Sequence, residues 1–243
     1  MNEWCRAPAG QAGAPPSIRV PHMPLRLRDN VHWCESAGRI VFLDIAADRY
    51  FCLPPEAGPA FLALAAGNAG PQDYARLGVL TDRGLLAESG SPEAFPQPAL
   101  VDCPSRDWLG FPAPRSTAVP MLRALIWEYR AARELRTRPF SDVIALARRR
   151  LKAREAPGNS ELTIQAIAAA AEAVAFVTRS HDRCLTRGIA AHAACCARGI
   201  HAKLILGVIA HPFAAHCWVQ WGNAVVIGGY EQARLYTPIL VIE

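Results

Sequence analysis

Hydrophobic and polar residues follow two different periods along the chain. Between residues 26 and 90 the pattern first alternates as in strands and then changes to the spacing of helices. Strands are predicted at 31–34, 40–43 and 49–53, and short helices at 57–66, 72–77 and 80–86. Ser36-Ala37-Gly38 is typical of a hairpin turn between the first two strands. This order predicts a small winged-helix-like unit of three strands and three helices.

In the C-terminal half the helical period comes first and the strand period follows. Helices are predicted at 119–135, 140–151, 162–177 and 182–198, and strands at 202–208, 215–221 and 224–227. Gly199 is placed to end the last helix, and Gly222-Asn223 favours a tight turn between the last two strands. The pattern predicts helices packed on an antiparallel sheet.

A proline-dense segment separates the two halves, and such a segment resists regular structure. We therefore predict an α+β protein with a flexible tail at 1–24, a winged-helix-like unit at 25–90, a linker at 91–118 and a second unit at 119–243. A chain of 243 residues has room for two domains of this size.

Charge and hydropathy exclude some classes of function. The net charge is +5 and nearly all the cations are arginines, an excess too small to indicate a dedicated nucleic-acid binder. The longest apolar run, at 166–171, is too short to span a bilayer, and residues 1–20 lack the apolar core of a secretion signal. We expect a soluble, cytoplasmic protein with no membrane span.

The eight cysteines do not form a known framework. Without a secretion signal, free thiols are expected in place of disulfides. The spacing contains no paired CxxC motifs, so a structural zinc site is not expected. We expect no metal and no cofactor, which leaves the question of whether one thiol is reactive.

Cys184 is the best candidate for a reactive thiol. It lies two residues after Asp182, which we expect to cap the helix that follows. The positive end of the helix dipole and the free amide hydrogens there stabilise a thiolate. Cys195 and Cys196 lie at the negative end of the same helix, where a thiolate is disfavoured, and are expected to be core residues.

His216 is the candidate base. It lies on a predicted strand after the helix of Cys184, which is the layout of papain-like thiol enzymes, in which an imidazole takes the proton of the thiol. His192, His201 and His211 are the competitors. His192 falls in mid-helix and His211 precedes a proline in a loop, so neither is favoured.

The C-terminal half resembles the lasso-peptide biosynthesis B proteins, whose C-terminal domain is a transglutaminase-like cysteine peptidase. The matching blocks agree in order and spacing: Cys184-Leu185, Arg198-Gly199-Ile200, Leu206-Gly207-Val208, Pro212-Phe213, His216-Cys217-Trp218-Val219 and Tyr236-Thr237-Pro238-Ile239-Leu240. The resemblance implies that Cys184 and His216 are catalytic and cut the leader from a ribosomally made precursor.

The N-terminal unit resembles a precursor-recognition element, the pyrroloquinoline-quinone chaperone-like winged helix. The agreeing residues are Leu43-Asp44, Asp48-Arg49-Tyr50-Phe51, Leu53 and Gly84-Leu85-Leu86. The resemblance implies that the leader adds as an extra strand along Arg49, Tyr50, Phe51 and Leu53. It also implies a partner, an ATP-dependent asparagine-synthetase-like cyclase that closes the macrolactam ring.

The chain departs from the family where an aspartate usually holds the histidine. If Gly222-Asn223 is a two-residue turn, His216 faces position 229, and Gly228 and Gly229 carry no carboxylate. Glu231, the diagonal neighbour, could reach the imidazole, although an exposed loop acid is the simpler interpretation. The departure keeps open a second hypothesis, a catalytically weakened module that binds the precursor and delivers it to the cyclase.

Two further interpretations concern basic residues. The winged-helix-like unit could bind DNA, but its helices offer chiefly Arg76 and Arg83, so this is disfavoured. The arginine run 148–150, with Lys152 and Arg154, is typical of a solvated helix face. Alternatively, this run docks an acidic partner surface such as that of the cyclase.

Overall fold

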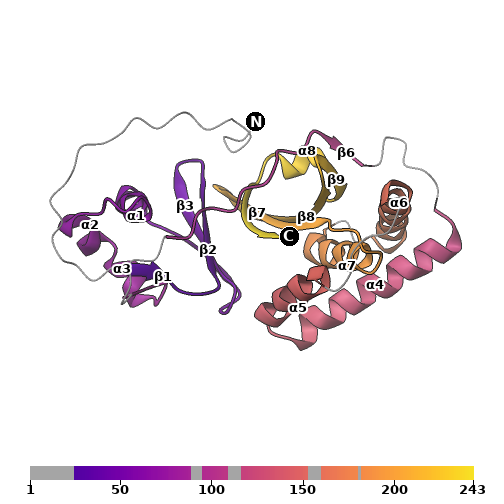
Figure 1. The fold of residues 1–243 in the computed structure, drawn as a ribbon, viewed down its shortest axis with the longest axis horizontal. Coiled ribbons are helices and arrows are strands. Elements are labelled where there is room, and N and C mark those ends of the chain that lie inside the picture. The colour runs from indigo at the N-terminus through magenta and orange to yellow at the C-terminus, as the bar shows by residue number, and fades with distance from the viewer. Residues whose placement is uncertain (1–24, 89–94, 109–115, 153–159, 180–181) are drawn as a thin grey trace.

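The computed structural model describes residues 25–88, 95–108, 116–152, 160–179 and 182–243. The tail predicted at 1–24 lies outside these residues. The described parts form two units joined by the segment around β6, and both units contain helices and strands (Figure 1). The α+β class predicted from the sequence is confirmed.

The N-terminal unit is built on a three-stranded antiparallel sheet of β2 (Val31–Ser36), β3 (Arg39–Asp44) and β4 (Arg49–Cys52). All three strands lie where the alternating pattern predicted them. Ala37 and Gly38 both have positive φ, as a tight hairpin turn requires, and they join β2 to β3 without a register shift. Among the described strands, β4 pairs only with β3, so its outer edge is free.

Short helices cover one face of this sheet. They are η2 (Pro55–Ala57), α1 (Gly58–Ala65), α2 (Pro71–Arg76) and α3 (Gly78–Asp82). The prediction of a helix at 80–86 was wrong in its second half, because α3 ends at Asp82. Gly84 turns the chain at a φ of 64°, and β5 (Leu86–Glu88) then pairs with β1 (Leu25–Leu27). The unit therefore has a second, two-stranded sheet that the sequence analysis missed.

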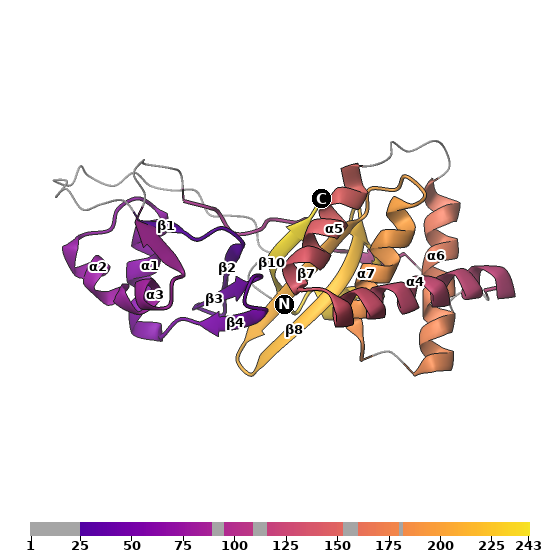
Figure 2. The ribbon, with the colours of Figure 1, turned by 90° about the horizontal axis from the view of Figure 1, so that it is seen from below.

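The three-stranded sheet is buried on both faces. One face packs on the short helices, where Phe61 makes edge-to-face contacts with Trp33 and Phe42, each at 4.9 Å between ring centroids. The other face packs on the C-terminal unit. Four of its side chains belong to the core cluster of that unit: Cys34, Val41, Leu43 and Ile45. Figure 2 shows this sheet lying against β10, β7 and β8.

The C-terminal unit consists of helices packed on one sheet. The helices are α4 (Ala118–Thr137), α5 (Phe140–Lys152), α6 (Ser160–Thr178) and α7 (Cys184–Cys196). The strands are β7 (Lys203–Ala210), β8 (Phe213–Trp221), β9 (Ala224–Ile227) and β10 (Thr237–Ile242), and the sheet order is β10-β7-β8-β9-β6. These helices and the strands β7 to β9 confirm the prediction. The sequence analysis missed β10 and the short helix α8 (Tyr230–Ala233).

Part of the segment predicted as a linker belongs to the C-terminal sheet. β6 (Arg106–Asp107) pairs in parallel with β9, and Trp108 packs edge-to-face on Trp221 with centroids 5.2 Å apart. Cys103 in the same segment is disulfide-bonded, so the prediction that every cysteine is reduced was wrong. The other six cysteines in the described part of the chain are free.

Helix α6 is long and apolar enough, by length and composition, to cross a membrane over Glu161–Thr178. The core helix of a globular domain satisfies the same criteria. α6 packs against α4, α7 and β9, and Glu172 within it forms an ion pair with Arg187 at 2.5 Å. These contacts place α6 in the core of the C-terminal unit.

Burial of histidines makes the fold sensitive to acid. Burial lowers the pKa of His192, whose ring lies between the carbonyl oxygens of Ala202 and Ala147. Burial, with a contribution from Arg148, lowers the pKa of His32 from 6.5 to about 4. Below pH 6.5 the unfolded chain binds protons that these folded histidines do not, so stability falls as pH decreases from 6.5 towards 4. We expect a loss of roughly 1–3 kcal/mol in urea unfolding between pH 7.5 and pH 5.

Single substitutions test the assignment to these groups. The variant His32→Gln should flatten the pH dependence of the unfolding free energy, because its side chain no longer titrates. The control His211→Gln changes an exposed residue and should leave the dependence as in the wild type. A wild-type stability that is the same at both pH values would contradict the prediction.

Candidate active site

Cys184 is the first residue of α7, and its side chain is partly buried and free. The residue before the helix is Arg183, and no side chain caps the helix. The prediction that Asp182 caps it was therefore wrong, and Asp182 is exposed. The position at the positive end of the dipole is confirmed, and the amide hydrogens of the first turn have no side-chain acceptor there.

Four other free thiols are buried and held in the protonated form. Burial raises the pKa of Cys34 and of Cys195 to about 12, and that of Cys196 to about 11. Burial, with a contribution from the nearby Cys184, raises the pKa of Cys217 well above its usual value. Since a thiolate is the nucleophile, these four side chains are poor candidates for thiol chemistry.

A glycine brings the helix of Cys184 close to the sheet. Gly188 lies one turn after Cys184, and a Cβ atom there would be 2.6 Å from Cys217 Sγ and 3.2 Å from Leu204 Cδ1. Only a residue without a side chain permits this approach of α7 to β8. The contact places Cys184 beside Cys217, the residue that follows His216.

We expect Gly188→Ala to lower the free energy of unfolding by about 1–3 kcal/mol, because the added methyl group overpacks the helix–sheet contact. Urea unfolding measures the change. Cys217→Ala removes the atom that is met first, so the double variant should recover part of the loss. Equal losses in the single and the double variant would show that the contact with Cys217 is not the cause.

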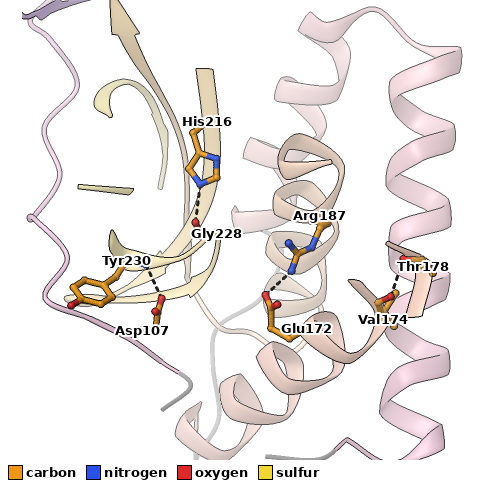
Figure 3. A network of polar contacts seen from close by, with 8 residues as sticks. All are labelled: Asp107, Glu172, Val174, Thr178, Arg187, His216, Gly228 and Tyr230. Atoms are coloured by element: carbon orange, nitrogen blue, oxygen red, sulfur yellow. Dashed lines mark hydrogen bonds and ion pairs between the residues drawn. The ribbon is translucent and has the colours of Figure 1, made fainter. Parts of the chain in front are cut away.

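His216 has a fixed hydrogen bond through one ring nitrogen. Its Nε2 lies 2.9 Å from the carbonyl oxygen of Gly228, as Figure 3 shows. A carbonyl only accepts, so Nε2 carries the proton and Nδ1 of the neutral ring is left as an acceptor. The ring stacks on Trp218 and touches Tyr236, with centroid distances of 6.1 Å and 5.1 Å.

The surroundings of His216 keep the imidazole neutral. Burial lowers its pKa, the hydrogen bond to Gly228 opposes this, and the charge of Arg187 adds to the lowering. Arg187 lies on α7 one turn after Cys184, is buried, and is paired with Glu172 (Figure 3). A neutral imidazole near pH 7 is able to accept a proton from a thiol.

The two catalytic candidates lie on neighbouring elements without a direct bond. Among the described residues, no hydrogen bond joins Cys184 to His216. Side chains alternate along β8, so Cys217 points to α7 whereas His216 shares the other face with Trp218. β9 pairs with β8 only at residues 219–221, so β8 has no strand partner at His216 on that side.

The register of β9 explains why Glu231 does not face His216 on a strand. The predicted pairing holds for Trp221 with Ala224 and for Gln220 with Val225, but a bulge then shifts it by one residue. Gly228 and Gly229 turn the chain away at positive φ. Glu231 is therefore exposed on α8, and the prediction that it lies diagonally across from His216 on a strand was wrong.

Asp107 of β6 takes part in holding this turn. Its Oδ1 accepts a hydrogen bond of 2.8 Å from the backbone amide of Tyr230, two residues after Gly228 (Figure 3). Burial raises the pKa of Asp107, and the bond from Tyr230 opposes the rise. The sequence analysis missed this residue because it lies in the proline-rich segment, more than 100 positions before its partner.

The other histidines lie apart from this site. His192 is fully buried and bonded to backbone carbonyls, with Cys196 Sγ 3.6 Å from its Nε2. His201 and His211 are exposed. No group of three or more potential metal ligands occurs in the parts of the chain that the structure describes.

The predicted leader-binding residues face in different directions. Arg49 is exposed, while Leu53 is 1% exposed and belongs to the N-terminal core. Phe51 packs on the same core, and the guanidinium of Arg83 lies 4.2 Å above its ring, so this arginine is engaged within the unit. Tyr50 packs instead on the core of the C-terminal unit. Among the described strands, Arg49, Tyr50 and Phe51 share the free backbone edge of β4, whereas Leu53 follows the strand.

Comparison with known proteins agrees with this geometry. A thiol at a helix start, beside an antiparallel sheet that carries a histidine, defines a papain-like arrangement of helix and sheet. Residues 125–241 match the model of the transglutaminase-like superfamily, so a domain of that superfamily is present in this part of the chain. The superfamily includes transglutaminases and cysteine proteases, and the match supports enzymatic activity of the cysteine-peptidase type. Neither the curated proteins nor the solved structures gave a match.

Proposed function

We propose that the protein is the leader peptidase of a lasso-peptide pathway. The observation that carries the proposal is Cys184 at the start of α7, beside the strand of His216, whose imidazole is oriented by Gly228 and kept neutral by burial. The winged-helix-like unit with a free strand edge supports it, because the same chain would then bind a peptide and cut it. The substrate would be a ribosomally made precursor.

The thiol would act by acyl transfer. Cys184 gives its proton to Nδ1 of His216, and Sγ attacks the carbonyl carbon of the scissile peptide bond. The oxyanion that forms then collapses, the C–N bond breaks, and the imidazolium protonates the leaving amine of the core peptide. Water attacks the leader thioester as His216 removes its proton. The thiol is restored, and the leader leaves with a new carboxylate.

The Gly228 carbonyl would do the work that an aspartate does in related sites. It accepts a hydrogen bond from Nε2–H and so keeps Nδ1 as the acceptor. It lacks the full charge that would stabilise an imidazolium, so we expect slower turnover than a carboxylate would give. The Cys184 thiol and Nδ1 of His216 would meet at the edge of β8 beside His216, where β9 does not pair with β8. Catalytic hydrogen bonds of this kind often form only with substrate bound.

The leader would bind by strand addition along β4. Main-chain groups of β4 are free on the outer side, and backbone pairing does not depend on the side chain of Leu53 being exposed. Deleting residues 120–243 would uncover the buried face that carries Val41 and Leu43. Leader binding is therefore best measured on the full chain.

The cyclase would be the partner that receives the cleaved core. Fewer arginines of the run on α5 are available to bind an acidic surface of the cyclase than the sequence suggested. Arg150 is paired with Glu134 at 2.6 Å, and Arg148 lies near His32. Arg149 is exposed and remains available. The side chains of Lys152 and Arg154 lie outside the described residues.

A second function has support from the geometry. Cys184 and His216 share no hydrogen bond, and Gly228 and Gly229 supply no carboxylate, so a module that only delivers the precursor to the cyclase is the alternative. The test is to incubate the wild-type chain with the precursor, with and without the cyclase, and to weigh the products by mass spectrometry. Free leader supports the peptidase. A tightly bound but intact precursor under both conditions would support delivery.

A further inference from the structure

Strand β4 belongs to the recognition sheet and also borders the thiol site. Its side chains alternate between two cores: Phe51 packs on the N-terminal core, while Tyr50 and Cys52 pack on the C-terminal core cluster, against which Cys184 also packs. Tyr50 is the residue of this strand that meets the C-terminal unit through an aromatic contact. The N-terminal unit thus contributes a side chain to the surroundings of the candidate nucleophile.

The ring of Tyr50 meets Phe213, the first residue of β8. The two centroids are 5.3 Å apart and the ring planes are tilted by 55°. Phe213 lies three residues before His216 on the same strand and is 52% exposed. An aromatic pair that joins the two units therefore stands beside the strand of the candidate base and remains open to solvent on one side.

The hydroxyl of Tyr50 is a free donor close to the thiols. Burial raises the pKa of Tyr50, so the phenol stays protonated. No residue in the described parts of the chain accepts a hydrogen bond from this hydroxyl. A protonated phenol that packs on the same core cluster as Cys184, and that lacks an acceptor among the described residues, is placed to donate to a bound peptide.

We propose that Tyr50 is a substrate-positioning residue of the thiol site, supplied to the C-terminal unit by the recognition strand. Its ring, together with that of Phe213, holds the peptide segment next to the scissile bond, and its hydroxyl donates to a backbone carbonyl of that segment. The inference rests on the proposed peptidase function. A leader strand paired with β4 would lie about 4.8 Å from it, so recognition and cleavage are coupled without a movement of the two units.

Kinetics on the full chain separate positioning from leader binding. Tyr50→Phe keeps the ring and loses the donor, and Tyr50→Ala loses both. We expect kcat/KM for leader release to fall roughly 10-fold and roughly 100-fold respectively. The Kd of the synthetic leader peptide, measured by fluorescence anisotropy, should stay within about 2-fold, since the paired backbone is unchanged. Tyr74→Phe, in a residue that packs on the N-terminal core, is the matched control and should cleave as the wild type.

A second measurement needs no precursor. If the ring of Tyr50 lines the approach to the thiol, iodoacetamide alkylation of Cys184, followed by peptide mass spectrometry, should be several-fold faster in Tyr50→Ala than in the wild type or Tyr74→Phe. Circular dichroism melting checks that each variant is folded. An unchanged alkylation rate in folded Tyr50→Ala would remove Tyr50 from the site.

The outcomes distinguish this inference from the function it depends on. Wild-type cleavage by Tyr50→Phe and Tyr50→Ala, with an inactive Cys184→Ala, would overturn the role of Tyr50 and leave the peptidase intact. A loss of leader affinity equal to the loss of kcat/KM would make Tyr50 a leader-binding residue and also overturn the proposal. Full cleavage by Cys184→Ala would overturn both.

Discussion

Leader release should fall by about 1,000-fold or more when Cys184 is replaced by alanine. The sulfur at the start of α7 is the atom that forms the acyl intermediate, and the buried thiols around it are held protonated. We expect His216→Ala to be nearly as slow, since the two side chains act as one unit. The measurement is the rate of appearance of free leader by mass spectrometry, at saturating precursor.

Cys217→Ala is the matched control for this loss. Cys217 is also a free thiol and lies beside Cys184, but its burial and raised pKa exclude it as the nucleophile. Its replacement should keep leader release within about 3-fold of the wild-type rate, apart from a small packing defect. If the Cys184 variant releases leader at the wild-type rate, the thiol mechanism is wrong. If only the Cys217 variant is inactive, the nucleophile has been assigned to the wrong cysteine.

The elements that hold the site follow from local sequence. Hydrophobic residues recur with the helical period in α7 and alternate in β7 and β8, because each element has one buried face. The turn at Gly222 sets the first residue pairs between β8 and β9. Cys184 and His216 lie on the elements from which their chemistry was predicted. What the sequence could not give was the bulge after Val225, since a bulge depends on packing against both neighbouring strands.

The remaining differences come from contacts between distant segments. Asp107 reaches the backbone of Tyr230, and Tyr50 reaches Phe213, in each case across a sequence separation with no local pattern. β6 is short and proline-flanked, so its own sequence does not favour a strand, and it exists because β9 offers a free edge. Sequence patterns do not indicate the roles of Asp107 and Tyr50, because these roles depend on contacts between segments that are distant in the sequence.

The shared core of the two units has a functional consequence. A recognition module on a flexible linker would hold its peptide at varying distances from the nucleophile. Here one face of the β2–β3–β4 sheet is covered by the C-terminal unit, with Val41 and Leu43 at 0% and 1% exposure. The orientation of β4 is therefore fixed by packing, and a leader that bound along β4, as we propose, would be positioned as soon as it binds.

The second large effect should come from Gly228→Ala, although the glycine has no functional side chain. A Cβ atom at this position would be 2.6 Å from Trp218 Cβ and 3.2 Å from His216 Nε2, and the backbone φ of 115° disfavours alanine. The turn must move, and the 2.9 Å bond that sets the tautomer of His216 is lost. We expect kcat for leader release to fall on the order of 100-fold, compared with the ~10⁴-fold loss when the tautomer is wrong in a Ser-His-Asp enzyme.

The pH profile separates this cause from general damage. The bond from Nε2 to Gly228 favours the protonated ring, so its loss should move the acid limb of kcat/KM to lower pH. Gly229→Ala is the matched control: it also has positive φ, but a Cβ atom there meets nothing within 4 Å. It should keep the acid limb in place and lose far less activity, as should Glu231→Gln on the exposed face of α8. Equal losses in the two glycine variants would mean that strain in the turn, and not the orientation of His216, limits the enzyme.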